Sequence, residues 1–227
     1  MKYLQKQILA LMLIPFSGIA WAKINITPVQ LNKLSGEKQI QYDSKLRWDQ
    51  RYNKSNYVYG KIPASFLAKN FTTLKPNSLV LDMGMGEGRN AVFLAKKGHR
   101  VLGVDISSVA IRKAQRLARE NNVKIKPLLA SLKKQDFPEN HFDAIICFYY
   151  VDRELTKKIK SWLKPGGVLI YEAYTMKEYD KGKTQEPLEY FLRPQELLDM
   201  FTGMEVVKYE EPMDESRYRA SIIVRKN

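Results

Sequence analysis

The chain contains almost none of the side chains that build disulfides and most zinc sites. Its 227 residues include one cysteine, Cys147, and two histidines, His99 and His141. A single cysteine excludes an internal disulfide and any zinc site built from cysteines. The two histidines stand apart from each other and from other clusters of ligand-type residues, so we expect no metal centre. Cys147 lies in an apolar run, which predicts a buried small hydrophobic side chain.

Long apolar runs are absent after the first 22 residues. Ile8 to Ala20 is almost wholly apolar, and Ala20-Trp21-Ala22 has small residues at the two positions that a signal peptidase reads. Only 16 residues separate Lys6 from Lys23, fewer than the ~20 that a helix needs to cross a bilayer. We therefore expect a signal peptide over 1–22 and a periplasmic or otherwise exported protein with no stable membrane span. The alternative without cleavage is a cytoplasmic or membrane-tethered protein.

The chain has fewer acidic residues than basic ones. The chain has 38 Lys and Arg against 24 Asp and Glu, for a net charge of +14. Such a surface favours anionic partners, including nucleic acid and acidic lipid headgroups. However, basic pairs such as Arg112-Lys113, Lys133-Lys134 and Lys157-Lys158 are spread over several segments, as on the solvated faces of helices. The charge by itself does not predict RNA binding.

Patterns typical of strands and helices alternate over most of the chain, which suits one domain with a full core. Apolar strand patterns cover 78–83, 100–104, 126–129, 142–149 and 168–174. Helical patterns stand between them at 89–97, 107–118 and 152–163. Repeated strand–helix units with short turns predict a mostly parallel sheet with helices on both faces.

The two ends of the chain depart from this rhythm. After a helix expected at 194–201, strands at 204–210 and 218–224 have no helix between them, which predicts an antiparallel hairpin. Pro63 is expected to open a helix that continues through Phe71, and Lys164-Pro165-Gly166-Gly167 is expected to form a turn. The predicted domain covers 46–227, behind an N-terminal arm over 23–45 that is expected to be extended to about Gln41.

The chemistry is concentrated where the first strand meets the first helix. Val80-Leu81-Asp82 is followed by Gly84, Gly86 and Gly88, and then by the helix from Arg89. Glycines let the backbone approach a ligand closely, and a helix N-terminus offers unpaired N–H groups. Asp105 follows the second strand, where a carboxylate can accept both hydroxyls of a ribose. These features predict a nucleoside site at the C-terminal edge of the sheet.

Residues 86–91 also fit the dinucleotide pattern G-x-G-x-x-A. Against a nicotinamide cofactor, Asp82 would repel a pyrophosphate but attract an ammonium group. The pattern Asp82-x-Gly84-x-Gly86-x-Gly88 resembles motif I of the class I S-adenosylmethionine (SAM)-dependent methyltransferases. Residues 163–167 resemble the turn that precedes their fifth strand. The stretches 48–52 and 190–194 resemble the tellurite-resistance-type (TehB-like) branch of this family. The resemblance implies a Rossmann-like α/β fold with a mostly parallel seven-stranded sheet and an antiparallel C-terminal hairpin.

The resemblance also implies how SAM would be bound. The three glycines would pass beneath its methionine part, and Asp82 would lie near its amino group through water. Asp105 would hold the ribose and Ile106 would pack on the adenine. Where family members often carry an acid after strand three, this chain has Ser131 beside Leu132. The implied cofactor set is Asp82, Gly84, Gly86, Gly88, Asp105, Ile106, Ser131, Leu132 and Phe148.

A methyl acceptor would lie beyond the end of the fourth strand. Phe148 and Tyr149 would flank the sulfonium and the incoming nucleophile. Tyr149 and Asp152 are the candidate bases, and Arg193 is a candidate for attracting an anionic substrate.

The expected reaction is direct in-line transfer of a methyl group to a small-molecule nucleophile, such as a thiol, an amine or a metalloid oxyanion. One alternative is an RNA methyltransferase, and another is a non-catalytic protein that binds SAM or a nucleoside.

Overall fold

The computed structural model describes residues 36, 43–182, 186–212 and 218–227. Residues Ile40–Asn227 form one compact unit. The predicted signal peptide and most of the predicted arm lie outside the described residues. Residues 43–45 of that arm are described, and they belong to a helix that covers 43–52. Among the described helices, none has the length and apolar character that a bilayer span requires.

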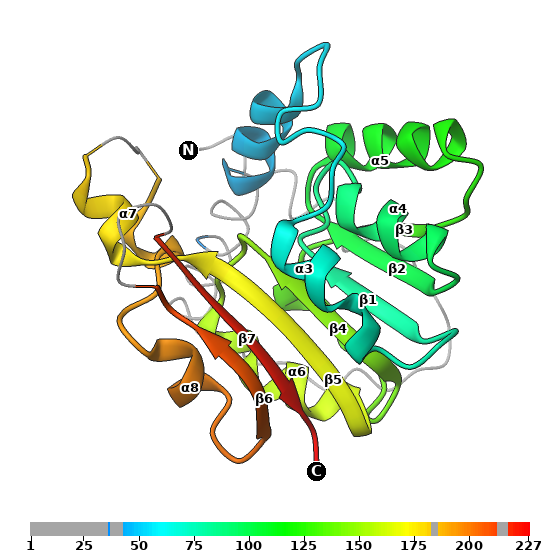
Figure 1. Cartoon of the computed structure of the whole chain (residues 1–227). Coiled ribbons are helices and arrows are strands. Elements are labelled where there is room, and N and C mark those ends of the chain that lie inside the picture. Colours follow the sequence, from blue (N-terminus) through cyan, green and yellow to red (C-terminus); the bar gives the residue numbers. More distant parts are fainter. Residues whose placement is uncertain (1–35, 37–42, 183–185, 213–217) are drawn as a thin grey trace, which may run out of the picture. The chain divides into compact units, whose positions relative to one another are not determined.

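Seven strands form one sheet in the order β3-β2-β1-β4-β5-β7-β6 (Figure 1). The strands are β1 (Leu79–Met83), β2 (Arg100–Asp105), β3 (Lys126–Leu129), β4 (Phe142–Phe148), β5 (Leu163–Tyr174), β6 (Glu205–Glu210) and β7 (Arg219–Arg225). The first five are parallel. The last strand, β7, runs antiparallel to both β5 and β6. The predicted mostly parallel sheet and the antiparallel hairpin are therefore confirmed.

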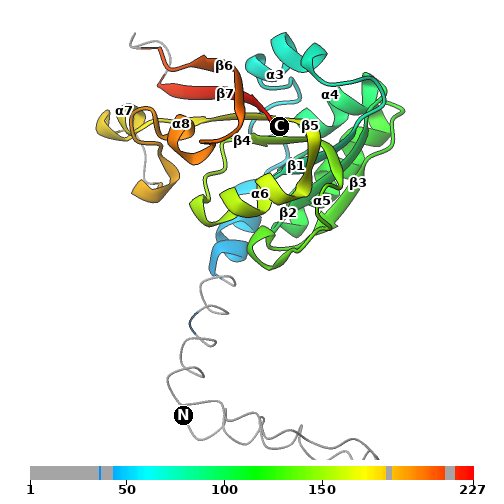
Figure 2. The same ribbon diagram turned by 90° about the horizontal axis from the view of Figure 1, so that it is seen from below.

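Helices cover both faces of this sheet, because each carries one apolar stripe that must be buried. The helices are α3 (Ser65–Asn70), α4 (Arg89–Lys96), α5 (Ser108–Glu120), α6 (Thr156–Trp162), α7 (Met176–Asp180) and α8 (Glu196–Met200), with short 3₁₀ turns η1 (Phe71–Thr73), η2 (Leu132–Lys134), η3 (Arg153–Leu155) and η4 (Leu188–Tyr190). Leu67 of α3 and Leu94 of α4 pack in one core cluster. Trp162 of α6 and Leu197 of α8 pack in another. Figure 2 shows α3 and α4 on the opposite side of the sheet from α6.

Helix α5 illustrates how the local sequence specifies an element. Ser107 is its N-cap, and its hydroxyl oxygen accepts a hydrogen bond from the Ala110 N–H at 3.1 Å, as predicted. The side chains spaced three or four apart are buried and face the sheet and α4: Ala110, Ile111, Ala114, Leu117 and Ala118. This spacing places them on one side of a helix of 3.6 residues per turn.

Three boundary predictions are wrong. The turn expected at 164–167 lies inside β5, where the pairing with β4 shifts register and Gly166 has a φ of +71°. The helix expected from Asp152 starts with the 3₁₀ turn η3, which the Asp152 carboxylate caps by accepting from the Glu154 N–H at 3.1 Å. The helix expected from Pro63 begins at Ser65, because Ala64 still has an extended ψ of 134°.

Strand β1 lies at the point where the order of the strands reverses. The chain passes from β1 through β2 to β3 on one side, and then returns to β4 on the other. In an open α/β sheet, the turns after such strands leave a crevice at their carboxyl ends. The turn that follows β1 therefore opens into that crevice.

Candidate functional site

The turn after β1 depends on glycine at three positions. Gly84, Gly86 and Gly88 have φ values of +64°, +53° and +86°, which L side chains rarely adopt. A Cβ on Gly86 would lie 2.8 Å from the Tyr52 hydroxyl oxygen, and one on Gly84 would lie 3.1 Å from Cβ of Tyr150. The turn is thus bounded by two tyrosines, and of its three glycines Gly84 is half-buried while Gly86 and Gly88 are buried.

Asp82 lies at the end of β1 and is only 1% exposed. Its Oδ2 atom is buried and has no hydrogen-bond partner within the described chain. Burial, and then the charge of Asp105, raises its pKa to about 8, although Arg89 and the Ala91 N–H act in the opposite direction. A buried carboxylate oxygen without a partner is costly, so this position is suited to a cationic or hydrogen-bond-donating ligand.

Asp105, at the end of β2, connects the glycine turn to the start of α5. Its Oδ2 accepts from the Gly86 N–H and its Oδ1 from the Ser107 N–H, both at 2.8 Å. Burial raises its pKa to about 6, while these two backbone hydrogen bonds act to lower it. Each oxygen keeps a second lone pair, so the carboxylate can still accept from two ligand hydroxyls.

The residues predicted on the adenine side have different environments. Ile106 and Ser131 are half-buried in the loops after β2 and β3. Leu132 is buried in the core cluster that includes Trp162, on the face covered by α6. Its side chain therefore packs in the core, and only its backbone is left to face a ligand.

At the end of β4, Phe148 is buried in the cluster beneath α3 and α4. Tyr149 follows it with a φ of +61°, a strained conformation for a non-glycine residue. The Tyr149 hydroxyl donates to Oε1 of Glu172 at 2.7 Å, and the Tyr149 N–H donates to the Glu172 carbonyl at 2.8 Å. Arg89 and Arg219 lie over the Tyr149 ring at 5.5 and 5.4 Å. Strain of this kind is typical of functional positions.

Burial, and then the charge of Glu172, raises the pKa of the Tyr149 hydroxyl above its usual value. The hydroxyl therefore stays protonated at neutral pH, which argues for a positioning role rather than for the predicted role as a base. Glu172 itself is buried and also accepts from the Ser221 hydroxyl at 2.8 Å.

Replacing Tyr149 by phenylalanine is expected to leave Oε1 of Glu172 without its hydroxyl donor. We expect the free energy of unfolding to fall by about 1–2 kcal/mol, the usual cost of losing a hydrogen bond to a buried charged group. Urea unfolding of the variant and the parent measures this difference. The Tyr179→Phe variant is the matched control, because Tyr179 is exposed. An equal loss in both variants would contradict the expectation.

The other two predicted catalytic residues have structural contacts. Asp152 accepts from the Tyr150 hydroxyl at 3.2 Å, in addition to capping η3. The Arg193 side chain is 69% exposed and donates to Glu196 at 3.1 Å. Within the described chain, no hydrogen bond, ion pair or ring contact joins Arg193 to Tyr149 or to the glycine turn. The structure thus brings Tyr149 to the crevice edge but gives no support for Arg193 there.

The helix over 43–52 lies against the crevice. Asp49 accepts from the Ser107 hydroxyl at 2.7 Å and from the Val109 N–H at 3.2 Å, so it also caps α5. Burial alone would raise the Asp49 pKa, but hydrogen bonds led by that from Lys45 lower it to about 2. Tyr52 is stacked on Trp48, with ring centroids 5.7 Å apart. These contacts hold Tyr52 over Gly86.

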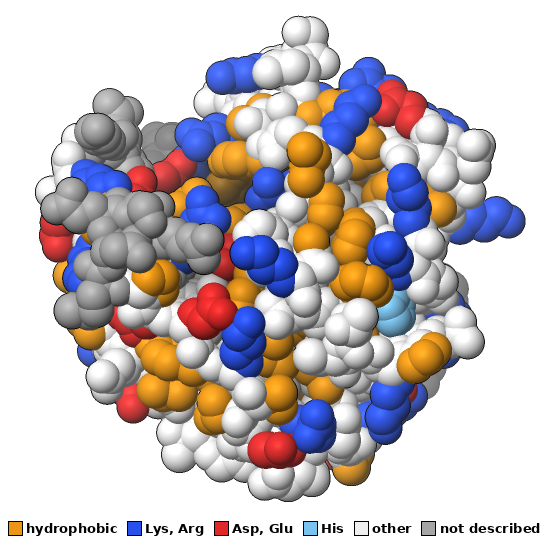
Figure 3. Space-filling model, viewed as in Figure 1, with side chains coloured by type: hydrophobic (Ala, Val, Ile, Leu, Met, Phe, Trp, Pro, Cys, Tyr) orange, Lys and Arg blue, Asp and Glu red, His pale blue; other side chains and the backbone are white. Residues whose placement is uncertain are grey.

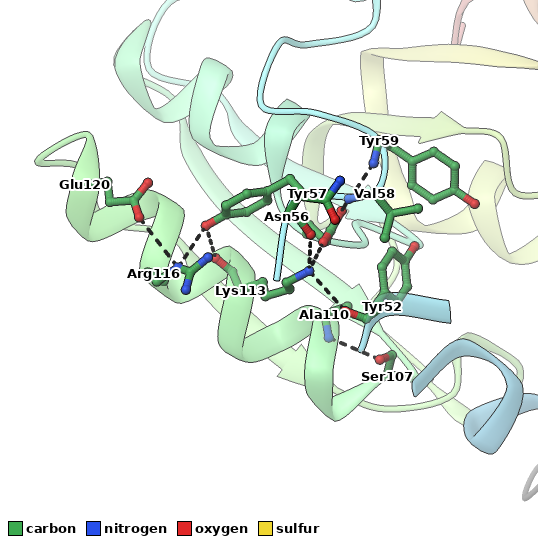
Figure 4. Close-up of polar contacts among 11 residues, drawn as sticks. Tyr52, Asn56, Tyr57, Val58, Tyr59, Ser107, Ala110, Lys113, Arg116 and Glu120 are labelled. Carbon is green, nitrogen blue, oxygen red and sulfur yellow. Dashed lines mark hydrogen bonds and ion pairs between the residues drawn. The ribbon is translucent and has the colours of Figure 1, made fainter. Parts of the chain in front are cut away.

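A buried ion pair ties the next segment, 53–59, to the same place (Figure 4). Lys113 reaches from α5 to Oε1 of Glu87 at 2.6 Å, and its Nζ also donates to the Asn56 and Tyr52 carbonyls. Oε2 of Glu87 accepts from the Val58 N–H at 2.7 Å. Since Glu87 belongs to the glycine turn, the turn, α5 and the aromatic segment are joined by one polar cluster.

Several of these residues were missed by sequence reasoning. Glu172 was detectable, because a charged residue within an apolar strand must find a buried partner. Glu87 stands between two glycines of the motif, but nothing local indicates Lys113 as its partner. In the sequence, Tyr150 stands out only because it follows Tyr149, and nothing there indicates its contact with the glycine turn.

Residues 80–167 match the family model described as a methyltransferase domain. The ubiquinone biosynthesis O-methyltransferase of Rickettsia akari is 27% identical over 169 residues, which cover 66% of this chain and 65% of that protein. The phosphoethanolamine N-methyltransferase of Plasmodium falciparum is 34% identical over 132 residues, covering 54% of this chain and 49% of that one. The chain thus spans between about half and two thirds of the length of these two relatives.

Solved structures share the fold. The crystal structure of TehB from Haemophilus influenzae superposes with a TM-score of 0.60 and 21% identity, over 81% of this chain and 67% of that one. A SAM-dependent methyltransferase from Aquifex aeolicus superposes with a TM-score of 0.58 and 19% identity, over 72% of this chain and 90% of that one. At these identities the likeness concerns the fold, which is the Rossmann-like fold predicted from the sequence.

Proposed function

We propose that this chain is a class I SAM-dependent methyltransferase, which transfers the methyl group of SAM to a small-molecule nucleophile by direct in-line displacement. The observation that carries the proposal is the unpartnered Oδ2 of Asp82, buried beside a glycine turn with positive φ angles. An amino group is the natural partner for that oxygen. The residues present therefore fit SAM.

In this proposal the chain binds and orients the cofactor. Asp82 holds the ammonium group, and Asp105 accepts hydrogen bonds from the ribose hydroxyls. Ile106 and the backbone near Ser131 enclose the adenine. Tyr52 and Tyr150 flank the turn and exclude water from it. SAM supplies an activated methyl group with its own leaving group, so the protein needs no covalent residue.

The acceptor would approach at the edge that Tyr149 forms. The Tyr149 ring, held by Glu172 and flanked by Arg89 and Arg219, would align the nucleophile behind the methyl carbon. Asp152 is the remaining candidate base, and its side chain is close to the Tyr150 hydroxyl. The acceptor class we propose comprises small thiols, amines and metalloid oxyanions. The names of the two relatives specify an oxygen acceptor and phosphoethanolamine, so hydroxyl compounds belong in the screen.

The test is calorimetric titration with SAM and S-adenosylhomocysteine, followed by transfer of tritiated methyl from SAM to that panel. We expect micromolar binding, and a loss of affinity of at least about tenfold in Asp105→Asn, because two hydrogen bonds to a charged acceptor are weakened. The matched control is Asp199→Asn, since Asp199 is an exposed acid on α8. A folded protein that binds neither compound would refute the proposal. Binding without transfer to any acceptor, RNA included, would favour a non-catalytic binding protein.

A further inference from the structure

The basic residues are distributed very unevenly. Residues 54–126 carry 14 Lys and Arg against 4 Asp and Glu, whereas the rest of the chain carries 24 against 20. Three of the four acids, Asp82, Glu87 and Asp105, are buried. Glu120 is therefore the one exposed acid between residues 54 and 126. In Figure 3, blue side chains gather on the right, over α4 and its surroundings, and most red ones lie elsewhere.

A groove of about 390 Å³ lies within this basic region. It runs between the segment 61–63 and α4. Four cations line it, above an apolar floor. The lining includes Lys61, Arg89, Lys96 and Lys97 as the cations, with Pro63 and Phe93 in the floor. Lys61 is paired with the exposed Glu120 at 2.7 Å, and the other three cations leave the groove with a positive charge that is complementary to a phosphate group.

An exposed apolar residue lies between two lining residues in the chain. Ile62, between Lys61 and Pro63, is 79% exposed, the largest exposed fraction among the large hydrophobic residues that the structure describes as exposed. Cations around an exposed aliphatic side chain are typical of surfaces that meet the headgroup layer of a membrane.

The same groove is poorly suited to nucleic acid. Binding sites for single strands use aromatic rings on which bases stack. Phe93 is packed edge-on against Phe71 at 5.3 Å, and the Lys97 ammonium lies over both rings. The ring is therefore not free to receive a base.

We propose that the groove formed by residues 61–63 and α4 docks the protein onto an anionic phospholipid bilayer, with a headgroup phosphate among Lys61, Lys96 and Lys97 and with Ile62 inserted between headgroups. Arg89 also lines the groove, and its guanidinium lies over the Tyr149 ring. The docking surface thus adjoins the side from which an acceptor would enter. This inference does not depend on the proposed methyl transfer.

The test is co-sedimentation of the chain from Lys23 onward, which keeps the whole compact unit Ile40–Asn227 and lacks the apolar leader. The vesicles are phosphatidylcholine alone or a 70:30 mixture with phosphatidylglycerol. We expect binding to the mixed vesicles at least about tenfold tighter than to the neutral ones, and a strong loss of binding at high salt.

Three variants decide whether the groove is responsible. The pair Lys96→Glu and Lys97→Glu is expected to weaken binding to the mixed vesicles at least about tenfold, and Ile62→Ser to weaken it about threefold. The pair Lys134→Glu and Lys157→Glu makes the same charge change at exposed positions of η2 and α6, and binding is expected to stay within about twofold. Circular dichroism checks the fold of each variant.

Equal binding to neutral and anionic vesicles would overturn the proposal. So would an equal loss in the two lysine pairs, because the effect would then come from net charge alone. Tight, salt-sensitive binding to a 20-nucleotide RNA with no binding to either vesicle would also overturn it, in favour of a nucleic-acid surface.

Discussion

Replacing Asp82 by asparagine is expected to abolish measurable SAM binding and to stabilise the ligand-free protein at the same time. The pKa of Asp82 is raised from 3.8 to about 8 by burial and by Asp105. A folded state that resists ionisation loses stability as the pH rises from about 4 to about 8, because the unfolded state ionises first. Asparagine carries no charge, so the variant avoids this loss. We expect the free energy of unfolding of the variant to exceed that of the parent by about 2 kcal/mol at pH 8. This is less than the full pKa shift of Asp82 would give.

Urea unfolding at pH 8 and at pH 4 measures the gain, and calorimetry measures SAM binding. The gain is expected to be much smaller at pH 4, where Asp82 is protonated in the folded state and only partly ionised in the unfolded state, because its unfolded-state pKa is 3.8. The control is Asp199→Asn, for which we expect neither effect, because Asp199 is exposed. A variant that binds SAM as the parent does would remove Asp82 from the site. A variant less stable than the parent at pH 8 would contradict the electrostatic argument.

Replacing Lys113 by methionine is expected to cause the largest loss of stability. Lys113 is the cationic partner of the buried Glu87, at 2.6 Å, and it also binds two carbonyls of the segment that leads to Tyr59 (Figure 4). Removing one member of a buried pair leaves an uncompensated charge, at a cost of about 3 kcal/mol or more. Thermal unfolding should show a Tm lower by roughly 6–12 °C. SAM affinity is expected to fall as well, because one of the contacts that hold Tyr52 over the glycine turn, the hydrogen bond from Lys113 to the Tyr52 carbonyl, is lost.

Two comparisons separate this effect from general damage to α5. Arg116 lies one turn further along α5 and pairs with the exposed Glu120 at 3.5 Å. The Arg116→Met variant is expected to change the Tm little, because surface ion pairs contribute little to stability. The double variant Glu87→Gln with Lys113→Met is expected to recover part of the loss, since the buried charge is then gone. No recovery would mean that the carbonyl contacts of Lys113, and not the ion pair, hold the segment.

The order of the elements was predictable because each depends on a pattern within about a dozen residues. The period-four apolar stripe of α5 and its Ser107 cap are examples. Boundaries failed where a tertiary contact extended or shortened an element. Residues 164–167 have the composition of a turn, yet hydrogen bonds of Gly166 and Gly167 with Lys226, just after β7, accompany their inclusion in β5.

The sequence by itself determined the fold class, the glycine turn and the two strand-end acids. These features are local, because a strand, a turn and a carboxylate close in the chain must be close in space. Only the tertiary structure decided which side chains surround that turn. Asp49 meets Ser107 across 58 residues, Lys113 meets Glu87 across 26, and Tyr149 meets Glu172 across 23. Such pairs leave no periodic trace in the sequence, since the packing of separate elements brings them together.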